Sequence, residues 1–417
     1  MAQRIRALRG FPDIGPEDTP GWRQLEDACA QVLDRYAFEQ IRLPILEATE
    51  LFARSVGEAT DIVEKEMFSF VDRERHSMSL RPEGTASAVR LGIDLGLLHN
   101  AQRRLWYIGP MFRHERPQAG RYRQFHQIGV ECFGIAGPLA DIEVIALSEQ
   151  LLQSAGVRSA VQLEINTLGS QAARAEYRGA LQSWLQERFD DLDADSQSRV
   201  ERNPLRVLDS KVPQTQALLV DAPKLVDYLD EDSLAHHRAV LDGLEALGID
   251  YVENPRLVRG LDYYNHCVFE WTTTELGAQG TVLAGGRYDG LVEQLGGGPV
   301  PACGFAMGLE RVLLLQKALD VAPVQRQLDI YICHEGVLAQ PRALTMAQDL
   351  RALGAKVCID GATGRLKPQL KRAAQSGAAM RVVIKDQTAD WSVLESEPAP
   401  ALREYFAKQG VAGPPAA

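Results

Sequence analysis

Two short segments hold the side chains of this chain that are best suited to chemistry. Residues 256–264 read Arg-Leu-Val-Arg-Gly-Leu-Asp-Tyr-Tyr, and residues 284–290 read Ala-Gly-Gly-Arg-Tyr-Asp-Gly. Glycine lets the backbone approach a ligand, arginine offers a forked cation to carboxylates and phosphates, and tyrosine supplies a flat wall with a hydroxyl at its edge. This mixture indicates a polar pocket for a small zwitterion beside a phosphate. The alternative, two strands joined by glycine-rich turns, would need separate buried partners for Arg259, Asp262 and Tyr264.

Two further segments place an arginine where a phosphate could bind. Phe-Arg-His-Glu at residues 112–115 ends a predicted strand, so Arg113 should lie on a sheet face near Glu115. An arginine held there can offset charge on a phosphorus that a carboxylate attacks. Gly-Leu-Glu-Arg at residues 308–311 opens a predicted helix, whose N-terminus together with Arg311 would suit terminal phosphates. The ordinary alternatives are a structural Arg–Glu ion pair and a common type of helix start.

The hydrophobic pattern predicts the elements that position these segments. We expect an antiparallel sheet with flanking helices in the first 320 residues, interrupted by a polar, charge-rich helical stretch at about 170–247. The strands are expected at residues 42–47, 67–80, 105–112, 124–133, 161–165, 257–273, near 281 and at 304–308. The helices are expected after an N-capping Thr19 and Pro20, around 142–152, and at 309–319.

Beyond residue 327 strands and helices alternate, which predicts a small parallel α/β domain. Its strands are expected at 328–333, 356–359 and 381–384, and its helices at 342–353, 366–376 and around 402–406. The predicted division is therefore 1–169 and 251–320 for one α+β domain, 170–250 for a helical insertion, 321–327 for a linker and 328–417 for the α/β domain.

The composition is that of an ordinary globular protein, with 45% hydrophobic and 24% charged residues among 417. No apolar run reaches the roughly 18 residues of a membrane span. The six cysteines are widely spaced without a Cys-x-x-Cys pair, which argues against zinc and disulfides and predicts a cytoplasmic location. The net charge is −11, yet six arginines and one acid lie between residues 103 and 126, and six Lys/Arg with no acid between 361 and 385. Such patches could steer a polyanion, although a solvated surface is the alternative for each.

In this order the three clusters resemble the three motifs of class II aminoacyl-tRNA synthetases, and the whole chain resembles the histidyl-tRNA synthetase family. The resemblance runs from Arg-Gly-Phe-Pro-Asp at residues 9–13 almost to residue 384. Its other matching segments are 79–85 (Ser-Leu-Arg-Pro-Glu-Gly-Thr), 107–117, 123–131, 166–170 and 203–211, with 256–264 and 284–290 as the two histidine-specific segments. The family implies activation of L-histidine with ATP to histidyl-adenylate, followed by transfer to the 3′-terminal adenosine of tRNA(His).

The resemblance assigns roles to individual residues. It implies that Arg113 and Arg259 are catalytic at the α-phosphate of ATP. The ATP-binding residues would be Arg113, Glu115, Arg121 and Arg311, the last at the γ-phosphate. The histidine-binding residues would be Glu83, Gly84, Thr85, Arg113, Gln127, Glu131, Arg259, Tyr263 and Tyr264. In this set Glu83, Thr85 and Gln127 would hold the ammonium, and Glu131 with Tyr264 would face the imidazole, which an apolar pocket could not satisfy.

The resemblance also implies partners. ATP would bind with Mg²⁺, without an assigned metal ligand on the chain. The tRNA-binding residues would be Arg116, Gln118 and Arg123 at the acceptor end, and Arg365, Lys367, Lys371 and Arg372 on one basic helix of an anticodon-binding C-terminal domain. Residues 19–70 resemble motif 1, which implies a homodimer, and no membrane partner is expected.

The chain departs from the family pattern in a few places. His266 and Cys267 stand where Arg-Thr is common, Pro368 falls inside the basic helix, and the stretch 386–400 is shorter than usual. A competing class is the regulatory subunit of ATP phosphoribosyltransferase, which shares the catalytic fold but charges no tRNA. Such paralogues typically lack an intact segment 259–264 and the C-terminal α/β domain, and both features are present in this sequence.

Overall fold

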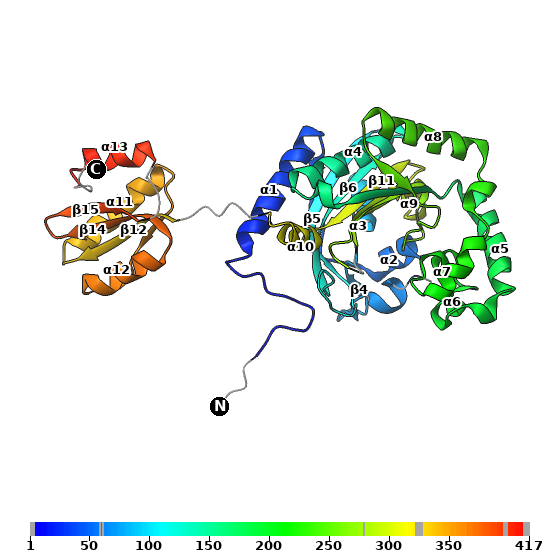
Figure 1. The fold of residues 1–417 in the computed structure, drawn as a ribbon, viewed down its shortest axis with the longest axis horizontal. Helices are drawn as coiled ribbons and strands as arrows, with labels where there is room; N and C mark the ends of the chain where they lie inside the picture. Colours follow the sequence, from blue (N-terminus) through cyan, green and yellow to red (C-terminus); the bar gives the residue numbers. More distant parts are fainter. Residues whose placement is uncertain are drawn as a thin grey trace. The chain divides into compact units, whose positions relative to one another are not determined.

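The computed structural model describes residues 5–57, 60, 62–277, 280–321, 328–362, 364–394 and 399–411. The chain folds into two compact units, Met1–Pro323 and Val324–Ala417 (Figure 1). Of the linker predicted at 321–327, all residues but Val321 lie outside the described parts of the chain. Among the described helices, none is long and apolar enough to cross a membrane.

The first unit is built on an eight-stranded sheet in the order β1-β5-β6-β11-β10-β9-β7-β8. Its strands are β1 (Glu39–Gln40), β5 (Arg103–Phe112), β6 (Gln124–Phe133), β7 (Gln162–Thr167), β8 (Tyr251–Glu253), β9 (Asn265–Thr272), β10 (Thr281–Arg287) and β11 (Ala302–Gly308). The central strands pair antiparallel, whereas the short edge strands β1 and β8 pair parallel. The register sets Gln127 opposite Gly308 and Glu131 opposite Gly304. Segments far apart in the sequence are thereby brought side by side.

Helices bury the apolar side chains of this sheet. α4 (Leu139–Ser154) and α10 (Leu309–Ala318) contact its central strands, and α1 (Thr19–Arg35) packs against both helices. The residue before α1 is Asp18, so Thr19 begins the helix instead of capping it. The cavity described below lies beside α3 (Thr85–Asp94), which contacts β6, α2 (Thr49–Val56) and α9 (Leu291–Gln294).

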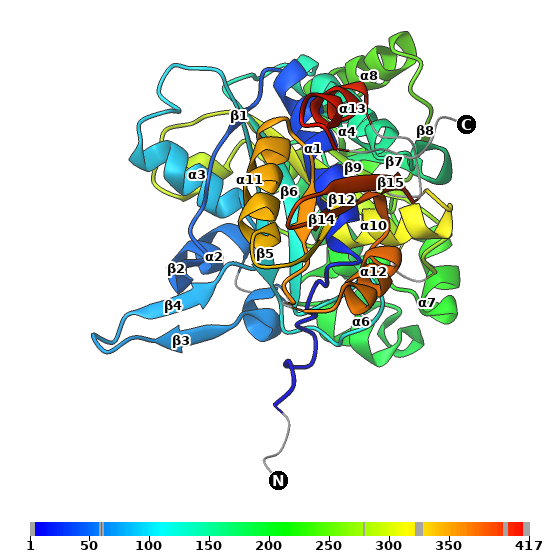
Figure 2. The same cartoon turned by 90° about the vertical axis from the view of Figure 1, so that its left-hand side faces the viewer.

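The strand expected at 67–80 is a hairpin. β3 (Ser69–Val71) and β4 (Ser77–Leu80) join β2 (Leu46–Ala48) in a separate antiparallel sheet, and Figure 2 shows the hairpin projecting from the unit. The expectation that 67–80 belongs to the main sheet was therefore wrong. The carboxylate of Asp72 accepts the backbone N–H groups of Glu74 and His76, both at 2.8 Å, and stabilises the turn that reverses the chain. The strand predicted at 42–47 begins only at Leu46.

The predicted helical stretch extends from Gln171 to Ala246. Its helices are α5 (Gln171–Gln186), α6 (Ala194–Arg199), α7 (Pro213–Leu218) and α8 (Glu231–Ala246). Side-chain caps start the two long helices: Ser170 accepts the N–H of Ala173 at 3.2 Å, and Asp230 accepts that of Ser233 at 2.7 Å. Because α8 packs on α4 and β9, this stretch is anchored to the main sheet.

The second unit has a four-stranded sheet in the order β13-β12-β14-β15. β12 (Leu328–Glu335), β13 (Val357–Ile359) and β14 (Ala378–Lys385) run parallel, and α11 (Ala339–Ala352), α12 (Leu366–Gln375) and α13 (Pro400–Lys408) complete the unit. The parallel α/β pattern was predicted correctly, but β15 (Ala389–Val393) was missed and pairs antiparallel with β14. Pro368 is the third residue of α12, where its missing N–H removes no helical hydrogen bond.

Candidate active site

One cavity of the first unit is lined by residues from the four segments that the sequence singled out for chemistry, 112–115, 256–264, 284–290 and 308–311. It contains about 930 Å³ of empty space, part of it open to solvent, within the range of roughly 300–1,000 Å³ usual for small-molecule sites. Strands β5, β6, β10 and β11 all contribute to its wall. The predicted residues on the wall are Glu83, Gly84, Thr85, Arg113, Glu115, Arg121, Gln127, Arg259, Tyr263, Tyr264 and Arg311. The structure therefore brings Arg113, Arg259 and Arg311 together around one hollow.

Arg113, Arg121 and Arg311 make part of this cavity strongly cationic. Arg113 donates from Nε to the carbonyl oxygen of Pro82 at 2.9 Å, and Arg311 donates to two other backbone carbonyls. Glu115 pairs with Arg121, so the expectation that it anchors Arg113 was wrong. Burial, followed by the charges of Arg113 and Arg121, lowers the pKa of Arg311. Cations held this close together favour a multiply charged anion between them.

Arg259 is held on the wall by an ion pair. Its Nη1 donates to Glu270 on β9, whose other oxygen accepts the Thr281 hydroxyl at 2.9 Å. The guanidinium carbon lies 5.6 Å from the centre of the Tyr264 ring. Burial acts against the charge on Arg259, but Glu270 and the adjacent tyrosines outweigh it and raise the pKa of the guanidinium. Its buried Nε has no hydrogen-bond partner among the described residues, which leaves a donor for a ligand.

Glu83 and Gln127 supply hydrogen-bond acceptors elsewhere on the wall. The carboxylate of Glu83 accepts the N–H groups of Thr85 at 2.6 Å and Ala86 at 3.0 Å, at the start of α3. Burial raises the pKa of Glu83, against those N–H groups and Arg113, which lower it. The buried Oε1 of Gln127 lacks a partner in the described part of the chain. A carboxylate next to a neutral acceptor suits an ammonium group.

Glu131 lies behind the cavity wall and is only 1% exposed. Tyr107, itself on the wall, donates to Glu131 Oε1 at 2.9 Å, and the hydroxyl of Tyr288 donates to Oε2. Burial raises the pKa of Glu131 to about 8, although the hydroxyls of Tyr288, Thr85 and Tyr107 act to lower it. When Glu131 is ionised it has about four acceptor positions, so these three hydroxyls leave room for one further donor.

Several residues of this site were not predicted, among them Tyr107, Tyr288, Glu270 and Glu310. The two tyrosines lie inside quoted segments, 107–117 and 284–290, so their positions were a usable signal. Their pairing with Glu131 depends on strand register, and no local sequence pattern specifies it. Glu270 had no signal beyond being an acid in a predicted strand.

We expect Gly129→Ala to damage this part of the site. A Cβ at position 129 would lie 2.0 Å from Cζ of Tyr107, which sits opposite on β5. Tyr107 would have to move and release Glu131, at a cost of about 1–3 kcal/mol in stability and with weaker binding of histidine, the ligand that the sequence resemblance implies. Thermal unfolding and the KM for histidine measure the two effects.

The matched control is Gly179→Ala in α5, where a Cβ would meet nothing within 4 Å. Alanine favours the helix, so this variant should gain about 0.5–1 kcal/mol. A folded Gly129→Ala protein with an unchanged KM for histidine would contradict the expected link between Tyr107 and histidine binding.

The loop between β5 and β6 carries the residues predicted to meet the tRNA acceptor end. Arg116 and Gln118 are exposed, and Arg123 is partly buried. Gln118 and Arg121 close the loop through reciprocal backbone N–H···O bonds of 3.0 Å. Exposed cationic and amide groups beside the cavity mouth are suited to a nucleic-acid backbone.

The residues predicted on one basic helix of the second unit are all exposed: Arg365, Lys367, Lys371 and Arg372. Of these, Arg365 precedes α12 as its N-cap residue instead of lying on it. Lys367 and Lys371 are four residues apart on α12 and share one face. Arg372 is engaged differently, because its Nε and Nη2 each donate to Asp360 at 2.8 Å. Part of the role of Arg372 is therefore to hold α12 against the sheet.

An antiparallel sheet with one arginine directly after a strand and another in the first turn of a helix, both facing one cavity, defines a class II aminoacyl-tRNA synthetase. The family model of histidyl-tRNA synthetase matches residues 10–312. A structure of apo histidyl-tRNA synthetase from S. aureus is 36% identical, with a TM-score of 0.79, and the match covers 97% of this chain and 100% of that chain. The chain belongs to the histidyl-tRNA synthetase family, and its activity is that of a histidine–tRNA ligase.

Two more distant structures share the fold. One is an ATP phosphoribosyltransferase regulatory subunit/histidyl-tRNA synthetase from Bacillus halodurans C, 23% identical, with a TM-score of 0.67 and coverage of 92% of this chain and 99% of that chain. The other is histidyl-tRNA synthetase from Nostoc sp. PCC 7120, 17% identical, with a TM-score of 0.67 and coverage of 98% and 100%. The predicted class II synthetase-like α+β fold is thus confirmed.

Proposed function

We propose that the cavity binds L-histidine and ATP side by side and joins them as histidyl-adenylate, with release of pyrophosphate. The observation that carries this proposal is the meeting of clustered guanidinium groups and buried acceptors on one wall. The carboxylate of histidine is already ionised at neutral pH, so the barrier lies in bringing one anion onto another. Arg113 and Arg259 would offset charge at the α-phosphate, and Arg121 and Arg311 at the outer phosphates.

The histidine end of the proposal rests on hydrogen-bond complementarity. Glu83, Thr85 and Gln127 would hold the ammonium, and Tyr263 would form a side wall. Glu131 and Tyr264 would satisfy the two imidazole nitrogens, with the carboxylate using the acceptor positions that the tyrosines leave open. An amino acid without a ring N–H would leave the remaining acceptor positions of Glu131 without a donor, a penalty that supports discrimination without editing.

ATP is proposed to bind with Mg²⁺. Glu115 and Glu310 place two carboxylates on the cavity wall, and Mg²⁺ is usually held by one or two carboxylates together with substrate phosphates and water. In the described residues a group of three candidate metal ligands occurs at Asp72, Glu74 and His76, on the β3–β4 turn. That group is not on the cavity wall, so an ion in the cavity would take most of its ligands from phosphates and water. The ion would there screen the charge of the phosphates.

The second step is proposed to transfer histidine to the terminal ribose of tRNA(His). Arg116, Gln118 and Arg123 would contact the acceptor end, and the basic face of α12 the anticodon, where phosphate contacts position the RNA and splayed bases identify it. Glu83 and Glu131 already accept hydrogen bonds, so neither carboxylate is a ready base. A phosphate oxygen of the adenylate would take the proton from the ribose hydroxyl.

A homodimer is proposed through the small sheet, which lies partly within the segment 19–70 that resembles motif 1. Four apolar side chains are exposed there: Ile45 (44%), Leu46 (43%), Phe70 (43%) and Val71 (62%). Exposed apolar side chains that cluster mark an interaction surface.

We expect Phe70→Asp to raise the dimer dissociation constant by about 100-fold, because it buries a charge in the interface. Light scattering after size exclusion measures this. Val337→Asp, at a valine 86% exposed in the second unit, should leave the dimer intact, and a dimeric Phe70→Asp protein would contradict the interface.

The decisive experiment for the function is ATP–pyrophosphate exchange with each of the twenty amino acids. We expect exchange with histidine alone and a requirement for Mg²⁺. A regulatory paralogue would show no exchange, and exchange with another amino acid would contradict the proposed pocket.

The assignment of regions follows the division made from the sequence. Residues 1–169 and 251–320 would form the catalytic domain, 170–250 an insertion, and 328–417 the anticodon-binding domain. The end of the first compact unit at Pro323 supports this division. A cytoplasmic location is supported by the free state of all six cysteines.

A further inference from the structure

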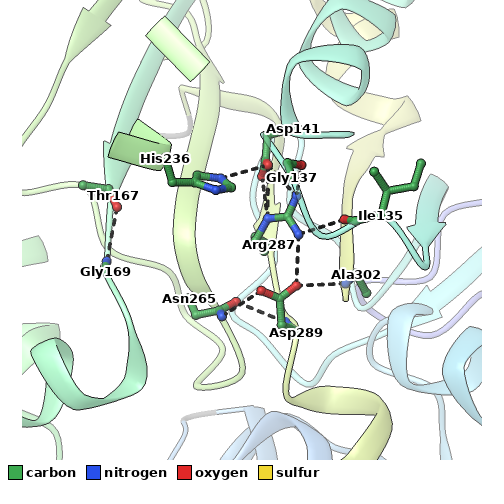
Figure 3. Close-up of polar contacts among 10 residues, drawn as sticks. All are labelled: Ile135, Gly137, Asp141, Thr167, Gly169, His236, Asn265, Arg287, Asp289 and Ala302. Atoms are coloured by element: carbon green, nitrogen blue, oxygen red, sulfur yellow. Dashed lines mark hydrogen bonds and ion pairs between the residues drawn. The ribbon is translucent and has the colours of Figure 1, made fainter. Parts of the chain in front are cut away.

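A polar cluster, buried at Asp141 and Arg287 and partly exposed at Asp289, links the residue directly after the first histidine-specific segment to the second segment (Figure 3). It consists of Asp141 on α4, Arg287 at the end of β10, Asp289 two residues later, and Asn265 at the start of β9. Figure 3 shows the four side chains meeting, with His236 of α8 reaching Asp141 at 3.1 Å. Of the described residues on the cavity wall, none belongs to this cluster. Its members therefore act on a ligand only through their neighbours.

Arg287 is the fixed centre of the cluster. The side chain is 0% exposed and donates to Asp141 from Nε at 3.1 Å and from Nη2 at 2.5 Å. It also donates to the carbonyl oxygens of Ile135 at 3.1 Å and Gly137 at 3.0 Å, and to Asp289 Oδ1 at 3.1 Å. A buried guanidinium with its donors engaged on all sides has one position, so Asp289 is held against a rigid support.

Asp289 and Asn265 form a reciprocal pair. Asp289 Oδ2 accepts from Asn265 Nδ2 at 3.2 Å, and the backbone N–H of Asp289 donates to Asn265 Oδ1 at 3.1 Å. Asp289 Oδ1 accepts from Arg287 and from the N–H of Ala302 at 3.0 Å. Each atom of the pair has a defined role as donor or acceptor. The pair is thus the direct bridge between the segments at 256–264 and 284–290.

The residues next to this bridge form the histidine end of the site. Tyr264 precedes Asn265 and lies on the cavity wall, whereas Tyr288 precedes Asp289 and donates to Glu131. The two tyrosine rings lie 6.4 Å apart at 83°. We infer that Asn265 and Asp289 are positioning residues for histidine recognition, because they set the distance between Tyr264 and the Tyr288–Glu131 pair. This inference rests on the proposed roles of Tyr264 and Glu131.

A swap of the two side chains tests the inference. Asn265→Asp places a carboxylate against the carboxylate of Asp289. Asp289→Asn replaces one acceptor oxygen with an amide NH₂ group. In one orientation this NH₂ faces the donor of Asn265, and in the other it faces the donors of Arg287 and Ala302. The double variant N265D/D289N restores a donor opposite an acceptor and keeps the net charge, so it isolates the pairwise contact.

The readouts are the histidine Kd by calorimetry, the KM values for histidine and ATP in exchange, and thermal unfolding. We expect each single variant to weaken histidine binding by roughly 10- to 100-fold, as for small misplacement of binding groups, with KM for ATP within about twofold of wild type. The swap should return the histidine Kd to within about threefold of wild type. Asn254→Asp is the matched control, since Asn254 also donates to a carboxylate, Glu164, at 2.6 Å, but away from the tyrosines; its histidine Kd should not change.

Folded single variants with wild-type histidine affinity would overturn the inference. So would a swap that binds histidine as poorly as the weaker single variant. If a single variant fails to fold, the swap decides alone: a folded swap with near-normal affinity supports the inference, and one with impaired affinity or no fold overturns it. Wild-type protein that binds histidine without exchange would instead contradict the proposed function and leave the affinity comparison valid.

Discussion

Arg259→Ala should slow histidyl-adenylate formation by roughly 10²-fold or more, the scale of losing one preorganised electrostatic stabiliser. The variant removes a buried cation from the cavity wall and leaves the carboxylate of Glu270, its ion-pair partner, without that cation. Glu270 would then repel the phosphate instead of orienting a cation toward it. Because the charge on the α-phosphate group rises as the nucleophile attacks, the loss should fall mainly on kcat.

Histidine-dependent ATP–pyrophosphate exchange measures this loss. Arg259→Lys keeps the charge but not the planar fork, so its rate should lie between those of wild type and the alanine variant. Arg238→Ala is the matched control, since Arg238 is an exposed arginine on α8. Near-normal turnover in a folded Arg259→Ala protein would remove Arg259 from the mechanism.

Glu131→Gln should lower kcat/KM for histidine by about 10²-fold or more, because an amide cannot ionise to form the charge-assisted hydrogen bond that a carboxylate can offer an imidazole N–H in a buried site. The KM for ATP should change little, since Glu131 contacts Tyr107 and Tyr288 at the end of the cavity proposed for histidine, away from the proposed phosphate site. Exchange is measured first with histidine varied and then with ATP varied, which gives the KM for each substrate separately. An equal rise in both KM values would point to general damage and contradict a specific role in histidine binding.

The same variant should change how stability depends on pH. Burial raises the pKa of Glu131 from its ordinary 4.5 to about 8. Between these values the native protein keeps a proton that the unfolded chain has released, so this group makes folding less favourable as pH rises through the window. Glu131→Gln removes that contribution. The melting temperature of the variant relative to wild type should therefore increase from pH 5 to pH 9, and a difference independent of pH would contradict the raised pKa.

Much of the architecture could be predicted because it follows from local patterns. β5, β6, α10 and the alternating elements of the second unit came from the spacing of apolar residues, with glycines marking the ends of helices. Arg113 and Arg311 were predictable from short motifs, since they occupy positions next to the ends of regular elements, whereas Glu83, Thr85 and Gln127 were predicted from the family resemblance. These features depend on neighbours in the sequence, which is why they could be read directly.

The remainder depends on contacts between distant residues. The hairpin at 69–80 requires the turn that Asp72 stabilises, and β15 forms only because β14 offers an unpaired edge. The hydrogen bonds of Glu131 and the ion pair of Arg259 with Glu270 are set by the packing of separate strands. The pairing of Arg372 with Asp360, twelve residues earlier, likewise depends on how α12 packs against its sheet.

The crowding of Arg113, Arg121 and Arg311 has a consequence for the protein between turnovers. Their mutual repulsion, which contributes to the lowered pKa of Arg311, is relieved whenever a polyanion enters, so the protein is more stable with the cavity filled. Such a field draws in pyrophosphate, inorganic phosphates and any nucleoside triphosphate alike. In the proposed ATP complex, the choice of adenine over other bases would therefore fall to the uncharged part of the wall, and the arginines would hold the nucleotide without selecting its base.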